Sequence, residues 1–209
     1  MSPRARLLTG LALTPALVIV VYMTLHEAGH ALAITAVGGQ VTDFVLGVNA
    51  HVGFTGVGLS LADEAWIRVS GVLLPLLVLV PFAALCPARL PGLLLRGAQL
   101  VTVISFAATL VPWVVIPLVS LVTAPPAGDD VTLFLQTSGL PALVLSASTA
   151  LTLAAVVLLA RRAGLAATWT ALRHAGRTPD GDVHYADADA DADAGSEPDG
   201  PEVGAELRR

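Results

Sequence analysis

The residues best suited to chemistry in this chain are His26, Glu27 and His30, within the motif His-Glu-Ala-Gly-His (H-E-x-x-H). On an α-helix His26 and His30 are four residues apart and share a face, so both imidazoles can reach one Zn²⁺ ion. Glu27 lies beside them, where its carboxylate can accept and return a proton. The motif therefore predicts a centre with Zn²⁺ as cofactor, His26 and His30 as ligands and Glu27 as general base.

The motif lies inside an apolar run from Leu11 to Val37. Ionisable groups in hydrocarbon are costly, so they usually serve a function or a partner. The competing interpretation is a set of buried polar side chains that hydrogen-bond between helices. That interpretation does not explain why Glu27, rather than Gln or Ser, stands between the two histidines.

A catalytic zinc also needs a third protein ligand and one open position. Asp129 and Asp130 follow a Pro-Pro-Ala-Gly turn that can bring them toward the motif, and we expect Asp130 to be the ligand ahead of Asp129. One of the two can instead cap the following helix, and the two roles can be divided between them. His51, in a glycine-rich segment, is the alternative third ligand.

The elements that must position these residues are strongly apolar. The 209-residue chain is 55% hydrophobic and 13% charged, whereas soluble domains carry about 25% charged residues. Its mean hydropathy is +0.78. We therefore expect an α-helical integral membrane protein that contacts the lipid bilayer. No basic patch is interleaved with aromatic residues, so nucleic-acid binding is not expected.

Apolar segments predict about four transmembrane helices, with a short β-like segment between the first and second. A secretory signal peptide is the alternative for the first, but its apolar run is too long for one. The expected membrane domain, 15–160, has spans at about 15–37, 66–85, 97–122 and 139–160, a glycine-rich β-like segment at 40–60 and an aspartate loop at 123–130. Around it we expect a basic head (1–14), a juxtamembrane segment (161–178) and an acidic, disordered tail (179–209).

Arginine placement predicts the orientation of these spans, because short cytoplasmic loops are enriched in positive charge. The arginines of the head, of the 86–96 turn and of the juxtamembrane segment fall on one side of a four-helix arrangement. The opposite loops carry Asp43, Asp63, Glu64, Asp129 and Asp130. Both termini are therefore expected in the cytoplasm.

Together, His26-Glu27-Ala28-Gly29-His30, the following Gly38-Gly39 and the later Ser70-Gly71 span resemble the site-2 protease family of intramembrane zinc metalloproteases, in particular its small bacterial members. The resemblance covers the layout of residues 15–140, and only the motif is specific. It differs from better-known members at the third ligand, where they have an Asn-Pro-Asp-Gly or Leu-Asp-Gly type of sequence. No loop is long enough for a PDZ-like insertion.

The resemblance implies a multi-pass protein, most simply of a bacterial plasma membrane, that acts in regulated intramembrane proteolysis. The expected reaction is hydrolysis of a peptide bond in or near a membrane segment of a protein or peptide substrate. Zn²⁺ would lower the pKa of its bound water toward about 7. Glu27 would take the water proton and pass it to the leaving amine.

Substrate binding is expected in the glycine-rich segment, at Gly53, Phe54, Thr55 and Gly56. This part of the chain can pair with an unwound substrate as an added strand. It can equally be a hairpin that only packs over the helices.

Two other functions fit the same residues. One is a catalytically inactive relative that binds a membrane partner, because the Asn-Pro-Asp-Gly sequence is missing. The other is a divalent-metal transporter that uses His26 and His30 as a transit site. The other three spans hold no carboxylate, which disfavours transport.

Overall fold

The computed structural model describes residues 3–47, 49–56, 58–85 and 92–175. Residues Met1–Thr178 form one compact unit. The acidic tail predicted at 179–209 lies outside the described residues.

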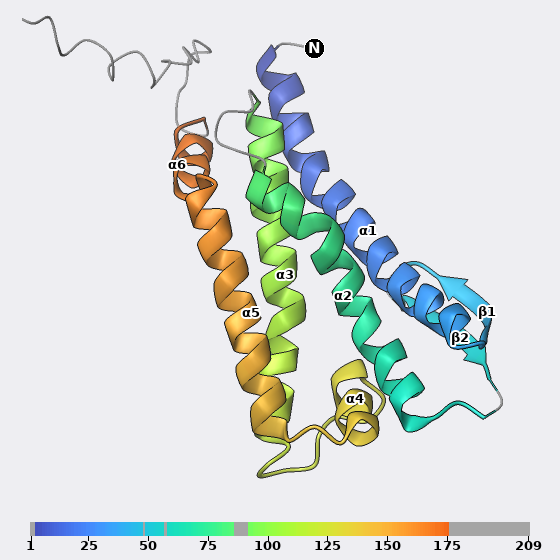
Figure 1. Ribbon diagram of the computed structural model, residues 1–209. Helices are drawn as coiled ribbons and strands as arrows, with labels where there is room; N and C mark the ends of the chain where they lie inside the picture. The colour runs from blue at the N-terminus through green and yellow to red at the C-terminus, as the bar shows by residue number, and fades with distance from the viewer. Residues whose placement is uncertain (1–2, 48, 57, 86–91, 176–209) are drawn as a thin grey trace, which may run out of the picture. The chain divides into compact units, whose positions relative to one another are not determined.

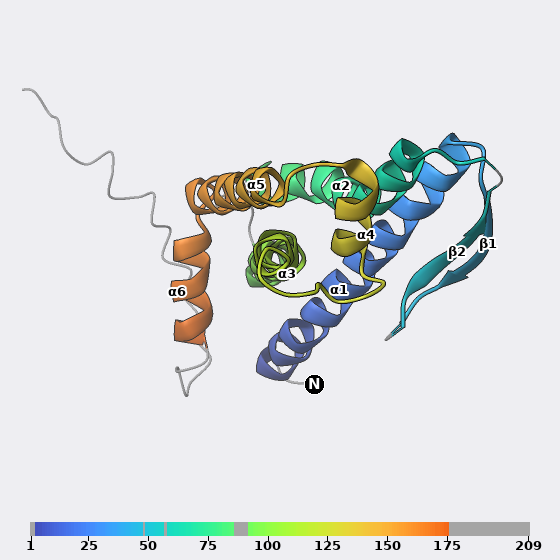
Figure 2. The ribbon, with the colours of Figure 1, turned by 90° about the horizontal axis from the view of Figure 1, so that it is seen from below.

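Four helices of the described chain are long and apolar enough to cross a membrane, and they match the predicted number. They are α1 (Pro3–Ala36), α2 (Leu61–Leu85), α3 (Leu93–Val119) and α5 (Ala142–Arg162) (Figure 1). Two shorter helices, α4 (Asp130–Ser138) and α6 (Leu165–Ala175), precede and follow α5. Helix α6 turns sharply away from the axis of α5 (Figure 2).

Helix α1 begins much earlier than predicted. The first span was expected to start at about residue 15, after a separate head at 1–14, but Pro15 lies inside a continuous 34-residue helix. Proline removes one helical hydrogen bond, yet membrane helices tolerate this when nearby groups satisfy the backbone. The Thr14 hydroxyl donates to the Gly10 carbonyl at 2.8 Å, so Thr14 is bonded within the helix and does not cap it. His26 consequently lies toward the C-terminal end of α1, away from its middle.

Helix α2 also begins before its predicted start at residue 66. The Ser60 backbone N–H and hydroxyl both donate to the Asp63 carboxylate, at 2.9 and 2.7 Å, and the Asp63 N–H donates back to the hydroxyl. This reciprocal capping satisfies free donors at the helix start. Asp63 and Glu64, expected in a loop, therefore form part of the first turn of α2.

The β-like segment is an antiparallel hairpin of β1 (Gln40–Val45) and β2 (His51–Thr55), with an irregularity between Val41 and Asp43. It lies beside the C-terminal half of α1 (Figures 1 and 2). Its apolar side chains pack against a small cluster of α1 and α2 residues centred on Ala33, Ile34 and Ile67. This packing fixes the hairpin next to the end of α1 that carries His26 and His30.

Helices α1 and α2 approach closely at Gly29. A Cβ atom on Gly29 would collide with the Ser70 backbone carbonyl, so only glycine allows this crossing. A larger apolar core, which includes Val72, Trp113, Val131 and Leu145, joins α2, α3, α4 and α5. The two contacts together hold the start of α4 near the α1–α2 crossing.

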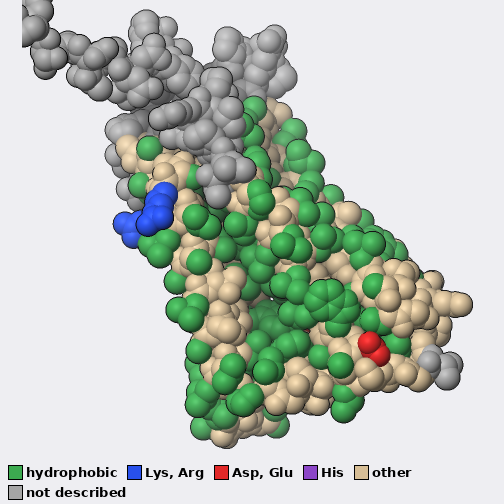
Figure 3. All heavy atoms as spheres, viewed as in Figure 1, with side chains coloured by type: hydrophobic (Ala, Val, Ile, Leu, Met, Phe, Trp, Pro, Cys, Tyr) green, Lys and Arg blue, Asp and Glu red, His purple; other side chains and the backbone are tan. Residues whose placement is uncertain are grey.

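The outward surface of the helices is mainly hydrophobic. Figure 3 shows hydrophobic side chains over most of the described part of one face, with only small basic and acidic spots. Large side chains exposed on the long helices include Leu17, Leu77, Leu143 and Leu151. A surface of this kind suits contact with lipid.

Candidate metal centre

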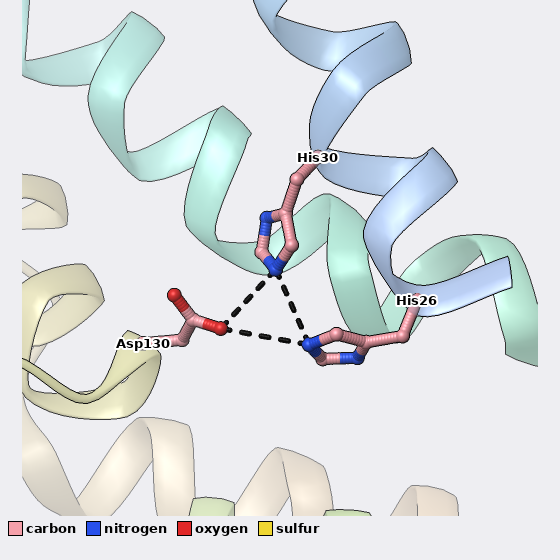
Figure 4. A group of neighbouring side chains, drawn as sticks. All are labelled: His26, His30 and Asp130. Atoms are coloured by element: carbon pink, nitrogen blue, oxygen red, sulfur yellow. Dashed lines mark hydrogen bonds and ion pairs between the residues drawn. The ribbon is translucent and has the colours of Figure 1, made fainter. Parts of the chain in front are cut away.

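The structure brings His26, His30 and Asp130 to one point (Figure 4). The His30 Nε2 atom is 3.2 Å from the His26 Nε2 atom and 3.2 Å from the Asp130 Oδ2 atom. The His26 Nε2 atom is 3.6 Å from the same oxygen. Two candidate ligands from α1 thus meet one from the first residue of α4, although Asp130 follows His30 by 100 positions in the sequence.

These three atoms fit a metal ion. Tetrahedral zinc sites with bonds of about 2.0–2.1 Å place neighbouring ligand atoms about 3.3–3.4 Å apart, close to the separations of 3.2, 3.2 and 3.6 Å. The chemistry of the set agrees, since two imidazoles and a carboxylate suit a divalent transition metal. The group can hold a metal ion, and the geometry does not identify which one.

The orientation of His30 is fixed by the backbone of α2. Its Nδ1–H donates to the Ile67 carbonyl at 2.7 Å, which leaves a lone pair on Nε2. That lone pair points toward the Asp130 carboxylate, another acceptor, so a cation or a shared proton is needed between them. The Ile67 carbonyl therefore prepares His30 to act as a ligand.

Space for the two imidazoles depends on Gly71. A Cβ atom there would collide with His30 Nε2 and would lie 3.0 Å from His26 Cε1. The glycines of the motif and of α2 thus have complementary roles, because Gly29 brings the helices together and Gly71 leaves room for the rings.

Asp129 and Asp130 divide the two roles expected for them. Gly128, with φ at +81°, turns the chain into α4. Asp129 is the N-cap, and its carboxylate accepts from the Thr132 N–H at 3.0 Å and from the Thr132 hydroxyl at 2.6 Å. Asp129 is not part of the cluster of His26, His30 and Asp130, and its carboxylate instead caps α4.

The Asp130 carboxylate is held in its charged form. Burial alone would raise the pKa of this carboxyl, but hydrogen bonds and charges from His26 and His30 outweigh burial and hold the pKa well below the usual aspartate range. Its second oxygen, Oδ1, is 3.4 Å from the Arg68 Nη1 atom. One oxygen thus faces the histidines and the other faces a guanidinium.

Glu27 is buried, with 5% of its surface exposed. Its Oε2 atom has no hydrogen-bond partner among the described residues. Most buried polar groups are bonded, and an unpaired carboxylate is costly. Glu27 is also one of the residues that line the cavity in front of the candidate metal ligands, so its carboxyl group lies next to the space that a bound molecule would occupy.

The cavity has a volume of about 330 Å³, and its walls come from α1, α2, the hairpin and the turn before α4. His51 and Phe54 contribute to its wall. His51 is bonded through Nδ1 to the Asn49 carbonyl at 2.8 Å and is not part of the ligand cluster. Of the four predicted substrate-binding residues, Gly53, Phe54 and Thr55 lie in β2 and Gly56 follows it.

Sequence reasoning missed the roles of Arg68, Gly71 and the Ile67 carbonyl. An arginine within an apolar helix requires a counter-charge, and Asp130 was an available carboxylate, so this contact could have been found. The other two roles depend on how α1 crosses α2, which the sequence does not define.

No family model matches the chain, and comparison with curated proteins and with solved structures finds no match. The functional argument therefore rests on the residues themselves.

Proposed function

We propose that this protein is an intramembrane zinc metalloendopeptidase similar to site-2 proteases. The observation that carries the proposal is the unpartnered carboxylate of Glu27 in the same cavity as His26, His30 and Asp130. A purely structural cluster would have no need of a buried carboxylate with a free oxygen. A hydrolase needs a base such as this carboxylate, because water must lose a proton as it attacks.

In the proposed reaction His26, His30 and Asp130 would hold Zn²⁺, which would supply Lewis acidity to the water and the scissile carbonyl. Glu27 would accept a proton from the attacking water on its carboxylate. As the peptide C–N bond breaks, Glu27 returns that proton to the leaving nitrogen. One water is consumed, and Glu27 ends the cycle as it began.

The membrane setting belongs to the same proposal. Helices α1, α2, α3 and α5 span the bilayer, and the arginine distribution favours cytoplasmic termini in a bacterial plasma membrane. With α1 starting at Pro3, the metal centre lies toward the outer side of the bilayer.

The substrate in this proposal is an extended segment of a membrane protein. Strand β2 is hydrogen-bonded to β1 in a two-stranded sheet, so its other edge offers backbone groups to an added strand. Phe54 of β2 lines the cavity, which brings this edge next to the ligands. Strand addition would hold an unwound peptide bond near Glu27.

The decisive experiment compares wild type with Glu27→Gln in purified, detergent-solubilised protein. We expect equal zinc stoichiometry and about 10²–10⁴-fold slower cleavage of membrane peptides by the variant. Chelation of the metal should abolish wild-type cleavage, and added Zn²⁺ should restore it.

Other outcomes would select the alternatives. Equal cleavage by both proteins would exclude Glu27 as the base. Bound zinc without cleavage of any membrane peptide in a broad panel would favour the inactive, partner-binding relative. Zinc uptake into proteoliposomes that required His26 and His30 would favour a transporter.

A further inference from the structure

Arg68 contacts both the ligand cluster and the substrate-binding hairpin. Its Nη1 atom is 3.4 Å from the Asp130 Oδ1 atom, and its guanidinium carbon is 5.9 Å from the centre of the Phe54 ring. The side chain is 29% exposed and lines the cavity. It lies one residue after Ile67, whose carbonyl orients His30.

We propose that Arg68 is a positioning residue that keeps Asp130 as a one-oxygen metal ligand. The inference rests on the metal centre of the proposed function. A carboxylate can bind a metal through one oxygen or through both. Because Oδ1 is paired with Arg68, only Oδ2 faces His26 and His30.

This restriction has a chemical consequence. Catalytic zinc sites hold three protein ligands and keep one position for water or substrate. If Asp130 turned and offered both oxygens, it would occupy that position. Arg68 therefore preserves the open position, and the Phe54 contact keeps the guanidinium in place through a cation–π interaction.

Co²⁺ substitution tests the inference, because the visible bands of bound Co²⁺ weaken when its coordination number rises from four to five. For Arg68→Gln we expect weaker bands than in wild type and about 10–100-fold slower cleavage. Arg68→Lys keeps a cation able to bond Oδ1, so we expect it to restore much of the spectrum. Arg161→Gln, an exposed arginine at the end of α5, is the matched control and should leave the spectrum unchanged.

A double-variant cycle separates positioning from general support of the fold. In the Asp130→Ala background, Arg68→Gln should cause no further change in the Co²⁺ spectrum, because the ligand through which it acts is gone. Equal spectra for wild type and Arg68→Gln would overturn the inference, as would a further change in the Asp130→Ala background. Since the spectrum does not depend on cleavage, a metal-binding but inactive protein would refute the proposed protease function while leaving this inference testable.

Discussion

Glu27 of α1 and Gln99 of α3 are both buried polar side chains on long apolar helices, with 5% and 1% of their surfaces exposed. Gln99 donates through Nε2 to the Ala83 carbonyl at 2.7 Å. The residue four positions after Ala83 is Pro87, which has no N–H to offer that carbonyl. Gln99 therefore completes the backbone bonding at the end of α2.

Glu27 has the opposite character, because its Oε2 atom lacks a partner among the described residues and the residue lines a cavity. A satisfied polar group stabilises a helical bundle, whereas an unsatisfied one reduces stability unless another molecule binds it. The comparison suggests that Gln99 serves the fold and that the Glu27 region serves a ligand. Variants of Gln99 should then change the stability of the protein, and variants around Glu27 should change the binding of a ligand.

The largest effect is expected at the two adjacent aspartates. Asp130→Asn removes the charged ligand oxygen, so we expect zinc affinity to fall by more than about 100-fold. Asp129→Asn is the matched control, because asparagine is an equally good N-cap and should leave affinity and stability nearly unchanged. Competition with a zinc chelator measures both. Equal losses from the two variants would show that the start of α4, and not the Asp130 oxygen, is what the metal requires.

A smaller effect is expected from Gly71→Ala. Its methyl group would collide with His30, and overpacking typically costs about 1–3 kcal/mol. If the rings move to relieve the collision, zinc affinity should fall by roughly 5- to 150-fold. The same chelator competition measures this change.

Gly97→Ala in α3 provides the control for that substitution. The nearest atom to its added Cβ would be Leu11 Cδ2 at 3.6 Å, an ordinary contact. Zinc affinity should be unchanged, and stability should rise by about 0.5–1 kcal/mol because alanine favours the helix. Unchanged affinity in Gly71→Ala would mean that the space beside the imidazoles is not limiting.

The local part of the site was predictable from sequence, and the tertiary part was only partly so. His26, Glu27 and His30 belong to one helix, whose period fixes their relation. Asp130 was favoured over Asp129, but the sequence alone did not exclude Asp129, since either residue can cap a helix.

For the fold, too, local features were predictable from the sequence and tertiary contacts were not. Hydropathy predicted four long apolar helices, because length and composition determine them, and the glycine-rich pattern predicted a short β-like segment between the first two. It did not predict that α1 continues through Pro15, since the cost of a helical proline depends on its surroundings. The sequence likewise did not identify Ser70 as the residue that Gly29 meets where α1 crosses α2.

The smallest effect on zinc affinity is expected at Gln99, which tests the structural side of the comparison. Gln99→Leu should leave the Ala83 carbonyl without this donor and lower the free energy of unfolding by about 1–3 kcal/mol. Zinc affinity should stay at the wild-type value, because Gln99 is not part of the ligand cluster. Denaturant titration in mixed micelles measures stability, and Gln136→Leu, at an exposed position of α4, should change it by less than about 0.5 kcal/mol. If Gln99→Leu instead lowered zinc affinity without a loss of stability, Gln99 and Glu27 would be functionally coupled. The distinction between a structural role for Gln99 and a ligand-binding role for Glu27 would then be wrong.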